Sequence, residues 1–285
     1  MGWRGPSPTG LRVVTAPPKL HVDKGLGRPP SLPGTRKVLS SVRPEFFVSL
    51  GPLHPHVLFE VLAYAIGFQL YRRARRRRGD VVDSETRWSV IVAAAVGAAV
   101  GSKLLAWAEH PADGFLISGK TIVGGLLGGW WAVEWAKRRA GVSERTGDLF
   151  AVPLCAGIAI GRVGCFLTGL SDKTYGRATE LPWAIDLGDG VGRHPTQLYE
   201  ILFLALLGLW LVRSRARLAD GSLPTGALFD RFVVAYFAFR LAVDFLKPGE
   251  PHLGLTAIQW GAVAGLLYHA RRSIHGSSRP TLPLL

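Results

Sequence analysis

The chain has 285 residues, which is enough for one membrane helix bundle or for one to two soluble domains. Hydrophobic residues make up 48% of it, and the formal net charge of +14 indicates either a nucleic-acid partner or an anionic membrane surface. Because the basic residues stand beside long apolar segments, we favour the membrane and expect no nucleic-acid partner. The two cysteines, Cys155 and Cys165, define neither a disulfide framework nor a metal site, and we expect no metal and no cofactor.

Residues 1–45 differ in composition from the rest of the chain. They are rich in proline, glycine and basic residues and contain no long apolar run, which predicts a disordered basic leader without a signal-peptide core. Met1 is the only methionine, so we hypothesise a true start further downstream, with Val42 as one candidate. We expect the membrane domain at residues 46–272 and a cytoplasmic tail at residues 273–285.

Seven stretches of the remaining sequence are apolar enough for transmembrane helices, each of which needs about 20 residues to cross the hydrocarbon core. They lie at about 56–71, 88–108, 118–136, 148–168, 196–212, 226–246 and 255–270. Clusters of arginine and lysine follow the first, third, fifth and seventh stretches, whereas the loop at 110–114 has neither residue. Such clusters mark cytoplasmic loops. The sequence therefore predicts an all-α polytopic membrane bundle with its N-terminus outside and its C-terminus in the cytoplasm.

The first stretch carries a polar stripe. His56, Glu60 and Tyr64 are spaced four residues apart, which places them on one face of a helix. A charge inside a membrane is costly, so Glu60 is either a paired structural carboxylate or part of a functional site. Because the stripe opens toward the predicted outer face, we favour the functional site.

The third stretch has four glycines within residues 124–129. Small residues at this spacing let two helices approach closely, so we expect helix packing here. Lys120 and Thr121 come just before it, but the glycine spacing and the preceding strand of a phosphate-binding loop are missing.

Arginine occurs inside two of the predicted helices, at Arg162 and Arg240. A guanidinium keeps its charge and offers paired donors in one plane, which suit a phosphate. Its counter-anion is either an internal carboxylate, such as Asp244 beside Arg240, or a lipid phosphate. Two arginines toward the outer face favour the phosphate. Their expected neighbours are Gly161, Gly164, Cys165, Tyr236 and Asp244.

Residues 170–193 are rich in glycine, proline and aspartate, which predicts an ordered, non-helical segment on the outer face. Pro195 suits the first turn of the next helix. We therefore expect His194 at that helix N-terminus, where it either points back at the site or simply caps the helix. Glu200 is expected within reach of Arg162.

These residues resemble the prolipoprotein diacylglyceryl transferase family of bacterial inner-membrane enzymes. The resemblance covers about residues 50–272 and includes the family's seven spans with the N-terminus outside. Its most specific part is the run Arg193-His194-Pro195-x-Gln197-Leu198-Tyr199-Glu200. Further similar motifs are Gly161-Arg162-x-Gly164-x-Phe166, Tyr175-Gly176, and Tyr236-x-x-x-Arg240 with Asp244.

The resemblance implies that phosphatidylglycerol, or a related anionic phospholipid, donates its diacylglyceryl group to the lipobox cysteine of a prolipoprotein and releases glycerol phosphate. It implies that Arg162 and Arg240 hold the phosphate. We expect Arg240, His194 and Glu60 to be catalytic, and the base for the thiol stays open among His194, Glu60, His56 and Asp244. The expected supporting residues are His56, Tyr64, Gly161, Gly164, Cys165, Gly176, Gln197, Tyr199, Glu200, Tyr236 and Asp244.

The chain departs from the family pattern and therefore resembles a divergent member. The histidine before the Gly-Gly-Leu of the third helix is Val123, and the asparagine after Gly-Arg-x-Gly is Cys165. Three further departures are Glu60 for a tyrosine, Thr168 for an asparagine and Leu170 for an acid.

Two alternatives remain open besides this transfer. One is a relative that uses the phospholipid site with another acceptor, and the other is a non-catalytic lipid-binding or lipid-transporting protein. We also consider Cys165 as a covalent intermediate, against the commoner role of a small buried apolar residue.

Overall fold

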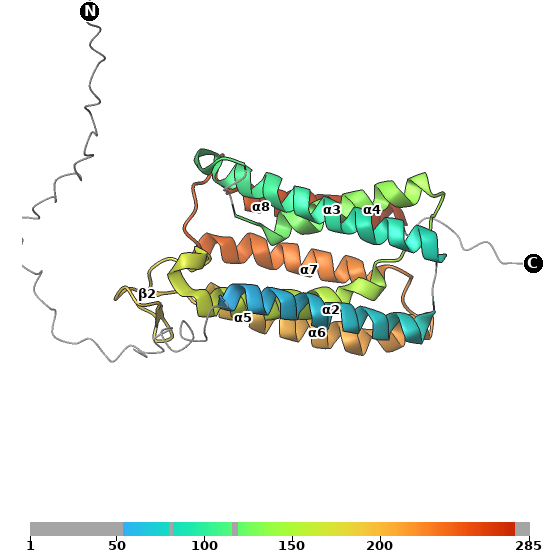
Figure 1. The fold of residues 1–285 in the computed structure, drawn as a ribbon, viewed down its shortest axis with the longest axis horizontal. Coiled ribbons are helices and arrows are strands. Elements are labelled where there is room, and N and C mark those ends of the chain that lie inside the picture. Colours follow the sequence, from blue (N-terminus) through green and yellow to red (C-terminus); the bar gives the residue numbers. More distant parts are fainter. Residues whose placement is uncertain (1–53, 80–81, 116–118, 277–285) are drawn as a thin grey trace, which may run out of the picture. The chain divides into compact units, whose positions relative to one another are not determined.

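The computed structural model describes residues 54–79, 82–115 and 119–276, and these residues form seven α-helices (Figure 1). The helices are α2 (Pro55–Arg78), α3 (Ser84–Glu109), α4 (Ile122–Arg139), α5 (Asp148–Thr168), α6 (Thr196–Ala219), α7 (Ala227–Val243) and α8 (Ala257–Gly276). The shorter elements are η1 (Pro111–Asp113), η2 (Gly169–Asp172), η3 (Asp244–Leu246), β1 (Ile185–Asp186) and β2 (Gly192–Arg193). The predicted leader at 1–45, the Val42 start and residues 277–285 of the predicted tail lie outside the described residues.

Each of the seven predicted stretches coincides with one helix. Most of the helices run past the predicted end, whereas α5 ends at the predicted residue and α7 ends three residues early, at Val243. The first stretch was predicted to end at residue 71, whereas α2 continues to Arg78, because arginine is itself a good helix former. Of the described helices, α3 and the segment Asp148–Asp172 are long and apolar enough to cross a membrane by length and composition alone. The other described helices do not meet this criterion, so the seven-span topology stays a prediction.

Helices α3 and α4 pack closely along their glycine faces. A Cβ atom added at Gly101 or Gly124 would overlap the backbone of the opposite helix, so this close approach requires glycine. At the end of the pair where α4 begins, the Ser102 hydroxyl donates a hydrogen bond to the Thr121 carbonyl over 2.9 Å. The close packing predicted for residues 124–129 is confirmed.

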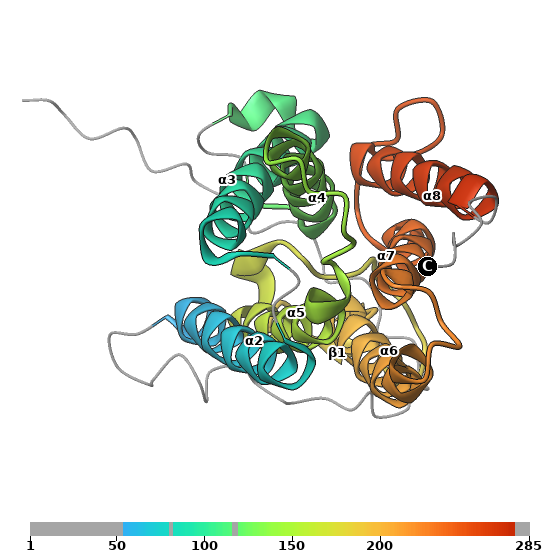
Figure 2. The same ribbon diagram turned by 90° about the vertical axis from the view of Figure 1, so that its right-hand side faces the viewer.

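The remaining helices pack around α5. Helix α2 lies against one side of α5 and α6 against the other, and α7 pairs with α8 (Figure 2). The largest apolar core lies where α5, α6 and α7 meet α4 and α8, and its buried members include Cys155, Leu204, Leu211, Phe232 and Phe237. Helix α5 therefore contacts α2, α6 and α7, which all carry predicted site residues.

The polarity of the bundle is that of a protein surrounded by lipid. Apolar side chains lie on outward faces, as Val92, Val96 and Val100 do along α3. Charged side chains are buried between the helices, among them Arg162 and Arg240. In a bilayer this arrangement keeps apolar groups toward the acyl chains and lets the buried charges pair with one another.

Candidate active site

A network of charged side chains is buried where α5, α6 and α7 meet. Glu200 of α6 is fully buried, and its Oε2 atom lies 2.8 Å from Nε of Arg162 and 3.2 Å from Nη1 of Arg240. Its Oε1 atom accepts a 2.6 Å hydrogen bond from the hydroxyl of Tyr236. Nη2 of Arg240 also donates to both carboxylate oxygens of Asp244, at 2.8 and 3.0 Å. The expectation that Glu200 reaches Arg162 is confirmed. Arg240 pairs with Asp244, the internal carboxylate that the sequence offered as the alternative to a lipid phosphate.

Both arginines keep buried N–H groups free for another acceptor. The Nε atoms of Arg162 and Arg240 are buried, and neither has a hydrogen-bond acceptor among the described residues. Although Nε of Arg162 is close to Glu200, its N–H does not point along the contact, so the pair is an ion contact. A buried donor without an acceptor is costly, which is a reason to look for a ligand acceptor at this place.

Lys247 extends the network beyond the end of α7. Its Nζ atom lies 3.8 Å from Oδ1 of Asp244. Burial, together with the neighbouring charges of Arg240 and Arg162, lowers the pKa of Lys247 to about 7. The amine therefore changes its charge near neutral pH, close to the two arginines.

A second polar group surrounds the N-terminal half of α2. Glu60 accepts a 3.1 Å contact from Nζ of Lys120 at its Oε1 atom, and the Tyr64 hydroxyl donates to the same oxygen at 3.5 Å. Nε2 of His56 lies 3.9 Å from the other oxygen of Glu60. The three residues of the predicted stripe thus share one face, as expected. Lys120, which binds Glu60, lies in the segment just before α4.

Cys165 connects the two groups. Nη1 of Arg162 donates to its sulfur over 3.7 Å. On the other side, Nδ1 of His56 lies 3.1 Å from Oδ1 of Asp172. The sulfur, one ring nitrogen of His56 and one carboxylate oxygen of Asp172 all lie within 4.8 Å of one another. The thiol is therefore next to both the buried arginine and the α2 stripe.

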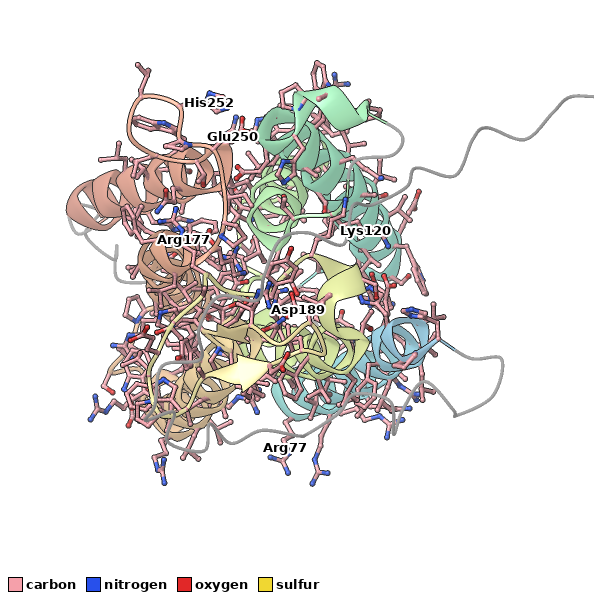
Figure 3. The ribbon with its side chains drawn as sticks, turned by 90° about the vertical axis from the view of Figure 1, so that its left-hand side faces the viewer. Arg77, Lys120, Arg177, Asp189, Glu250 and His252 are labelled. Atoms are coloured by element: carbon pink, nitrogen blue, oxygen red, sulfur yellow. The ribbon has the colours of Figure 1, made fainter. Side chains whose placement is uncertain are left out.

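The segment between α5 and α6 covers this end of the bundle (Figure 3). Its strands β1 and β2 pair antiparallel, and the Arg177 amide donates to the Leu246 carbonyl over 2.7 Å, which ties the segment to the end of α7. A Cβ atom at Gly176 would lie 2.6 Å from that of His194, so only glycine fits there. The segment is ordered and non-helical over most of its length, as its composition predicts.

The loop is also held by its own charges. Arg193 donates to both carboxylate oxygens of Asp189, at 2.6 and 2.7 Å. The hydrogen bond from this guanidinium holds the pKa of Asp189 below its usual value. The arginine of the most specific motif therefore stabilises the loop and does not join the buried arginines.

His194 lies outside the arginine network. Helix α6 begins at Thr196 with Pro195 as its N-cap, so His194 does not cap it. Its Nδ1 atom lies 3.4 Å from the Tyr199 hydroxyl, which also accepts a 2.7 Å hydrogen bond from Trp183. Among the described residues, no hydrogen bond or ion pair joins His194 to the arginines or to Glu200. The contact with Tyr199 ties the ring to the loop, and the catalytic role expected for His194 stays a prediction.

Other predicted positions support the packing around the site. Gln197 is buried and donates to the Thr174 hydroxyl over 3.3 Å. Gly164 lets α5 approach α2, because a Cβ atom there would lie 2.7 Å from that of Phe59. Nothing lies within 4 Å of a Cβ atom built at Gly161, so space remains beside Arg162. Val123 is fully buried in the apolar core.

Two contacts at this end of the bundle were missed by the sequence analysis. Glu109, at the end of α3, accepts a 3.0 Å hydrogen bond from the Ile258 amide and so caps the start of α8. Lys120 was considered only for a phosphate-binding loop, whereas it binds Glu60. A charge at the very end of an apolar stretch is the signal that would have indicated both.

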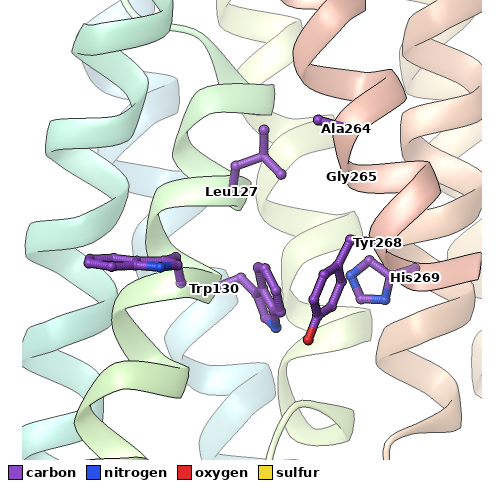
Figure 4. A pocket seen from close by; sticks show the side chains of 7 residues that line it. Leu127, Trp130, Ala264, Gly265, Tyr268 and His269 are labelled. Carbon is purple, nitrogen blue, oxygen red and sulfur yellow. The ribbon is translucent and has the colours of Figure 1, made fainter. Parts of the chain in front are cut away.

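A pocket between α4 and α8 lies apart from these residues. It is lined mainly by aromatic and small side chains, including Trp130, Tyr268 and Gly265 (Figure 4). None of the predicted site residues lines it. His269, at its edge, lies 3.2 Å from Asp230.

Comparison with known proteins identifies the family. The family model described as prolipoprotein diacylglyceryl transferase matches residues 45–271. Proteins named phosphatidylglycerol–prolipoprotein diacylglyceryl transferase are similar, among them one from Geobacter sulfurreducens that is 32% identical over 70% of this chain and 80% of its own length. One from Nitratidesulfovibrio vulgaris is 34% identical over 75% and 84%, and one from Solidesulfovibrio magneticus is 33% identical over 79% and 91%. The chain belongs to the prolipoprotein diacylglyceryl transferase family, a family of transferases of lipoprotein biosynthesis.

Proposed function

We propose that this protein transfers the diacylglyceryl group of phosphatidylglycerol to the lipobox cysteine of prolipoproteins in the bacterial inner membrane. The observation that carries this proposal is the pair of buried arginines whose Nε–H groups have no hydrogen-bond acceptor among the described residues. The names of the similar proteins supply the donor and the acceptor.

Arg162 and Arg240 are suited to hold one phosphodiester. Glu200 contacts both guanidinium groups, so it fixes them side by side. A guanidinium has five N–H donors, and the contacts to Glu200, Asp244 and Cys165 leave some of these for a ligand. The arginines are positive, buried and already oriented, which is what binding a phosphate away from water requires.

The same arginines would stabilise the leaving group. The acceptor sulfur forms a bond to the glycerol carbon that carries the phosphate, and the bond between that carbon and the phosphate oxygen breaks. Glycerol phosphate leaves with the bonding electrons and gains negative charge as it does so. Positive groups beside this oxygen favour the transition state over the bound lipid, which is how they accelerate the reaction.

The acceptor thiol must also lose its proton, because the thiolate is the nucleophile. His56 and Glu60 lie on the Cys165 side of Arg162, whereas His194 contacts Tyr199. We therefore assign the acceptor side of the reaction to the α2 stripe and give His194 a role in holding the loop.

We also propose that all seven helices cross the membrane, with the end that carries the 170–194 segment outside. Arginine and lysine gather at the opposite end, in the last turns of α2 and α4. These basic residues are expected on the cytoplasmic side.

The test is rescue of a bacterial cell that has been depleted of its own diacylglyceryl transferase. We expect the wild-type chain to restore lipoprotein maturation and growth and the Arg240→Ala variant to fail. Arg145→Ala is the matched control, because Arg145 is also ion-paired, with Asp230, but lies at the opposite end of α7. Failure of the wild-type chain, with the protein present in the membrane, would favour a different acceptor or a non-catalytic lipid-binding role.

A further inference from the structure

Three side chains that are far apart in the sequence form one cluster beside Arg162. His56 comes from α2, Cys165 from α5 and Asp172 from η2. One nitrogen, one sulfur and one oxygen of these residues all lie within 4.8 Å of one another. No metal site was expected from the sequence, in which both cysteines lie in one apolar segment.

The three donor types are those that bind Zn²⁺. Imidazole nitrogen, thiolate sulfur and carboxylate oxygen are its usual protein ligands, and in catalytic sites three of them leave a fourth tetrahedral position for water or substrate. The bond lengths and angles of such a site place its ligand atoms ~3.5 Å apart. In this structure the three ligand atoms lie up to 4.8 Å apart. This distance exceeds the value for a zinc site by little more than an ångström, and side-chain rotation can remove the difference.

The contact between His56 and Asp172 is not a hydrogen bond. The two atoms lie 3.1 Å apart, yet Nδ1 of His56 is a buried nitrogen without a hydrogen-bond partner among the described residues. The nitrogen and the oxygen thus lie close together without a proton directed between them. Two ligands of one cation have this relation, since each points its lone pair at the metal and not at the other ligand.

Neighbouring groups hold the three ligands in place. The Thr174 hydroxyl donates a 2.7 Å hydrogen bond to the second carboxylate oxygen of Asp172. Glu60 lies 3.9 Å from the Nε2 atom of His56, whereas Nδ1 is the nitrogen that lies 3.1 Å from Asp172. Partners of this kind orient metal ligands and fix the nitrogen that binds.

The charges of the cluster also balance. A thiolate at Cys165 and the carboxylate of Asp172 together neutralise a divalent cation. The nearby guanidinium of Arg162 is already compensated by Glu200. The positive arginine therefore does not exclude a cation from this place.

We propose that His56, Cys165 and Asp172 bind a Zn²⁺ ion whose fourth position takes the sulfur of the acceptor cysteine. This inference rests on the proposed function. The thiol loses its proton to solvent as the sulfur binds Zn²⁺, the thiolate forms the bond to the glycerol carbon, and the glycerol phosphate leaves with the electrons of the broken bond. A metal in this role activates the thiol without a protein side chain as the base.

The first test measures metal binding on the full-length protein, purified in detergent with a tag that contains no histidine. After treatment with a chelator and reloading with Zn²⁺, we expect about one zinc per chain by elemental analysis, following the proposed three-ligand site. Cys165→Ser and Asp172→Asn should weaken zinc binding by more than about 100-fold, since losing even an outer partner costs about 10–100-fold. Cys155→Ser is the matched control and should bind zinc as the wild type does.

Cobalt gives a readout that is specific for a sulfur ligand. The wild type loaded with Co²⁺ should show a sulfur-to-cobalt charge-transfer band, and the Cys155→Ser control should show it too. Loss of this band in Cys165→Ser supports the assignment. No zinc bound by the wild type, or equal binding by Cys165→Ser, overturns it.

Transfer measured on the same samples separates this inference from the proposed function. Transfer from phosphatidylglycerol to a lipobox peptide that disappears with the metal and returns with Zn²⁺ supports both. Equal transfer with and without zinc overturns the metal role and leaves the transferase function in place. Stoichiometric zinc without any transfer supports the metal site and contradicts the proposed function.

Discussion

Replacing Glu200 with glutamine removes a buried negative charge that contacts both arginines. Its carboxylate lies 2.8 Å from Arg162 and 3.2 Å from Arg240, and it also accepts the hydroxyl of Tyr236. Glutamine has nearly the same shape, so the substitution tests the charge with little change in packing. Afterwards Asp244 alone faces Arg240, and Arg162 keeps no carboxylate partner among the described residues.

The expected cost follows from these distances. The Coulomb attraction is about 6 kcal/mol to Arg162 and about 5 kcal/mol to Arg240, for an effective dielectric constant of about 20. The cost of desolvating the charges offsets most of it, so we expect a net loss of about 3–5 kcal/mol, as for other broken buried ion pairs. At about 2–4 °C per kcal/mol, this lowers the melting temperature by about 6–20 °C.

Thermal unfolding of the purified protein in detergent measures this loss. Tyr236→Phe is the matched control, because it removes only one hydrogen bond to the same carboxylate and should cost about 1–3 kcal/mol. Adding Arg162→Met to Glu200→Gln restores the charge balance, so the double variant should be more stable than the sum of the single losses by about 0.5–3 kcal/mol. A loss below about 1 kcal/mol for Glu200→Gln, or purely additive losses, would refute the coupled network.

Three further predictions concern packing, capping and pH. Gly101→Val should destabilise the α3–α4 pair by at least about 1–3 kcal/mol in thermal unfolding. Gly125→Ala should cost far less, because the added carbon makes only ordinary contacts there. Equal costs would contradict the close approach of the two helices. Asp148→Asn should lower the free energy of unfolding by about 1–3 kcal/mol, because this carboxylate accepts hydrogen bonds from three backbone N–H groups at the start of α7, over 2.6–3.2 Å. An unchanged melting temperature would show that the cap contributes nothing. The pKa of Lys247 is about 7, so its positive charge is present below that pH and lost above it. The KM for phosphatidylglycerol should therefore rise as the pH increases through about 7. A rise that persists in Lys247→Met would exclude this amine as the cause.

Much of the fold could be predicted because these helices appear in the sequence as long apolar runs. The limits of the helices were less accurate, since apolar length stops at the first charge whereas the backbone does not. Helix α2 therefore runs through its arginines to Arg78. Spacing within one helix was also a reliable guide, because residues four apart share a face, as the Arg240–Asp244 pair shows.

The parts of the site that join different helices could be predicted only in outline. Glu200 was expected near Arg162, but its second contact with Arg240 depends on how α5, α6 and α7 pack. The cluster of His56 with Cys165 depends on η2 turning back toward α2, which no local spacing indicates. The contact of His194 with Tyr199 likewise depends on the fold of the loop, which no local spacing indicates.

The most direct test of the phosphate clamp is transfer from phosphatidylglycerol to a lipobox peptide by the purified protein, followed by the mass of the peptide. We predict transfer by the wild type and by Arg145→Ala, and a loss of at least about 100-fold in Arg162→Ala, the effect of removing one donor that stabilises a developing negative charge. Wild-type turnover by Arg162→Ala would show that this arginine is structural, and it would contradict the proposed role of the two buried arginines.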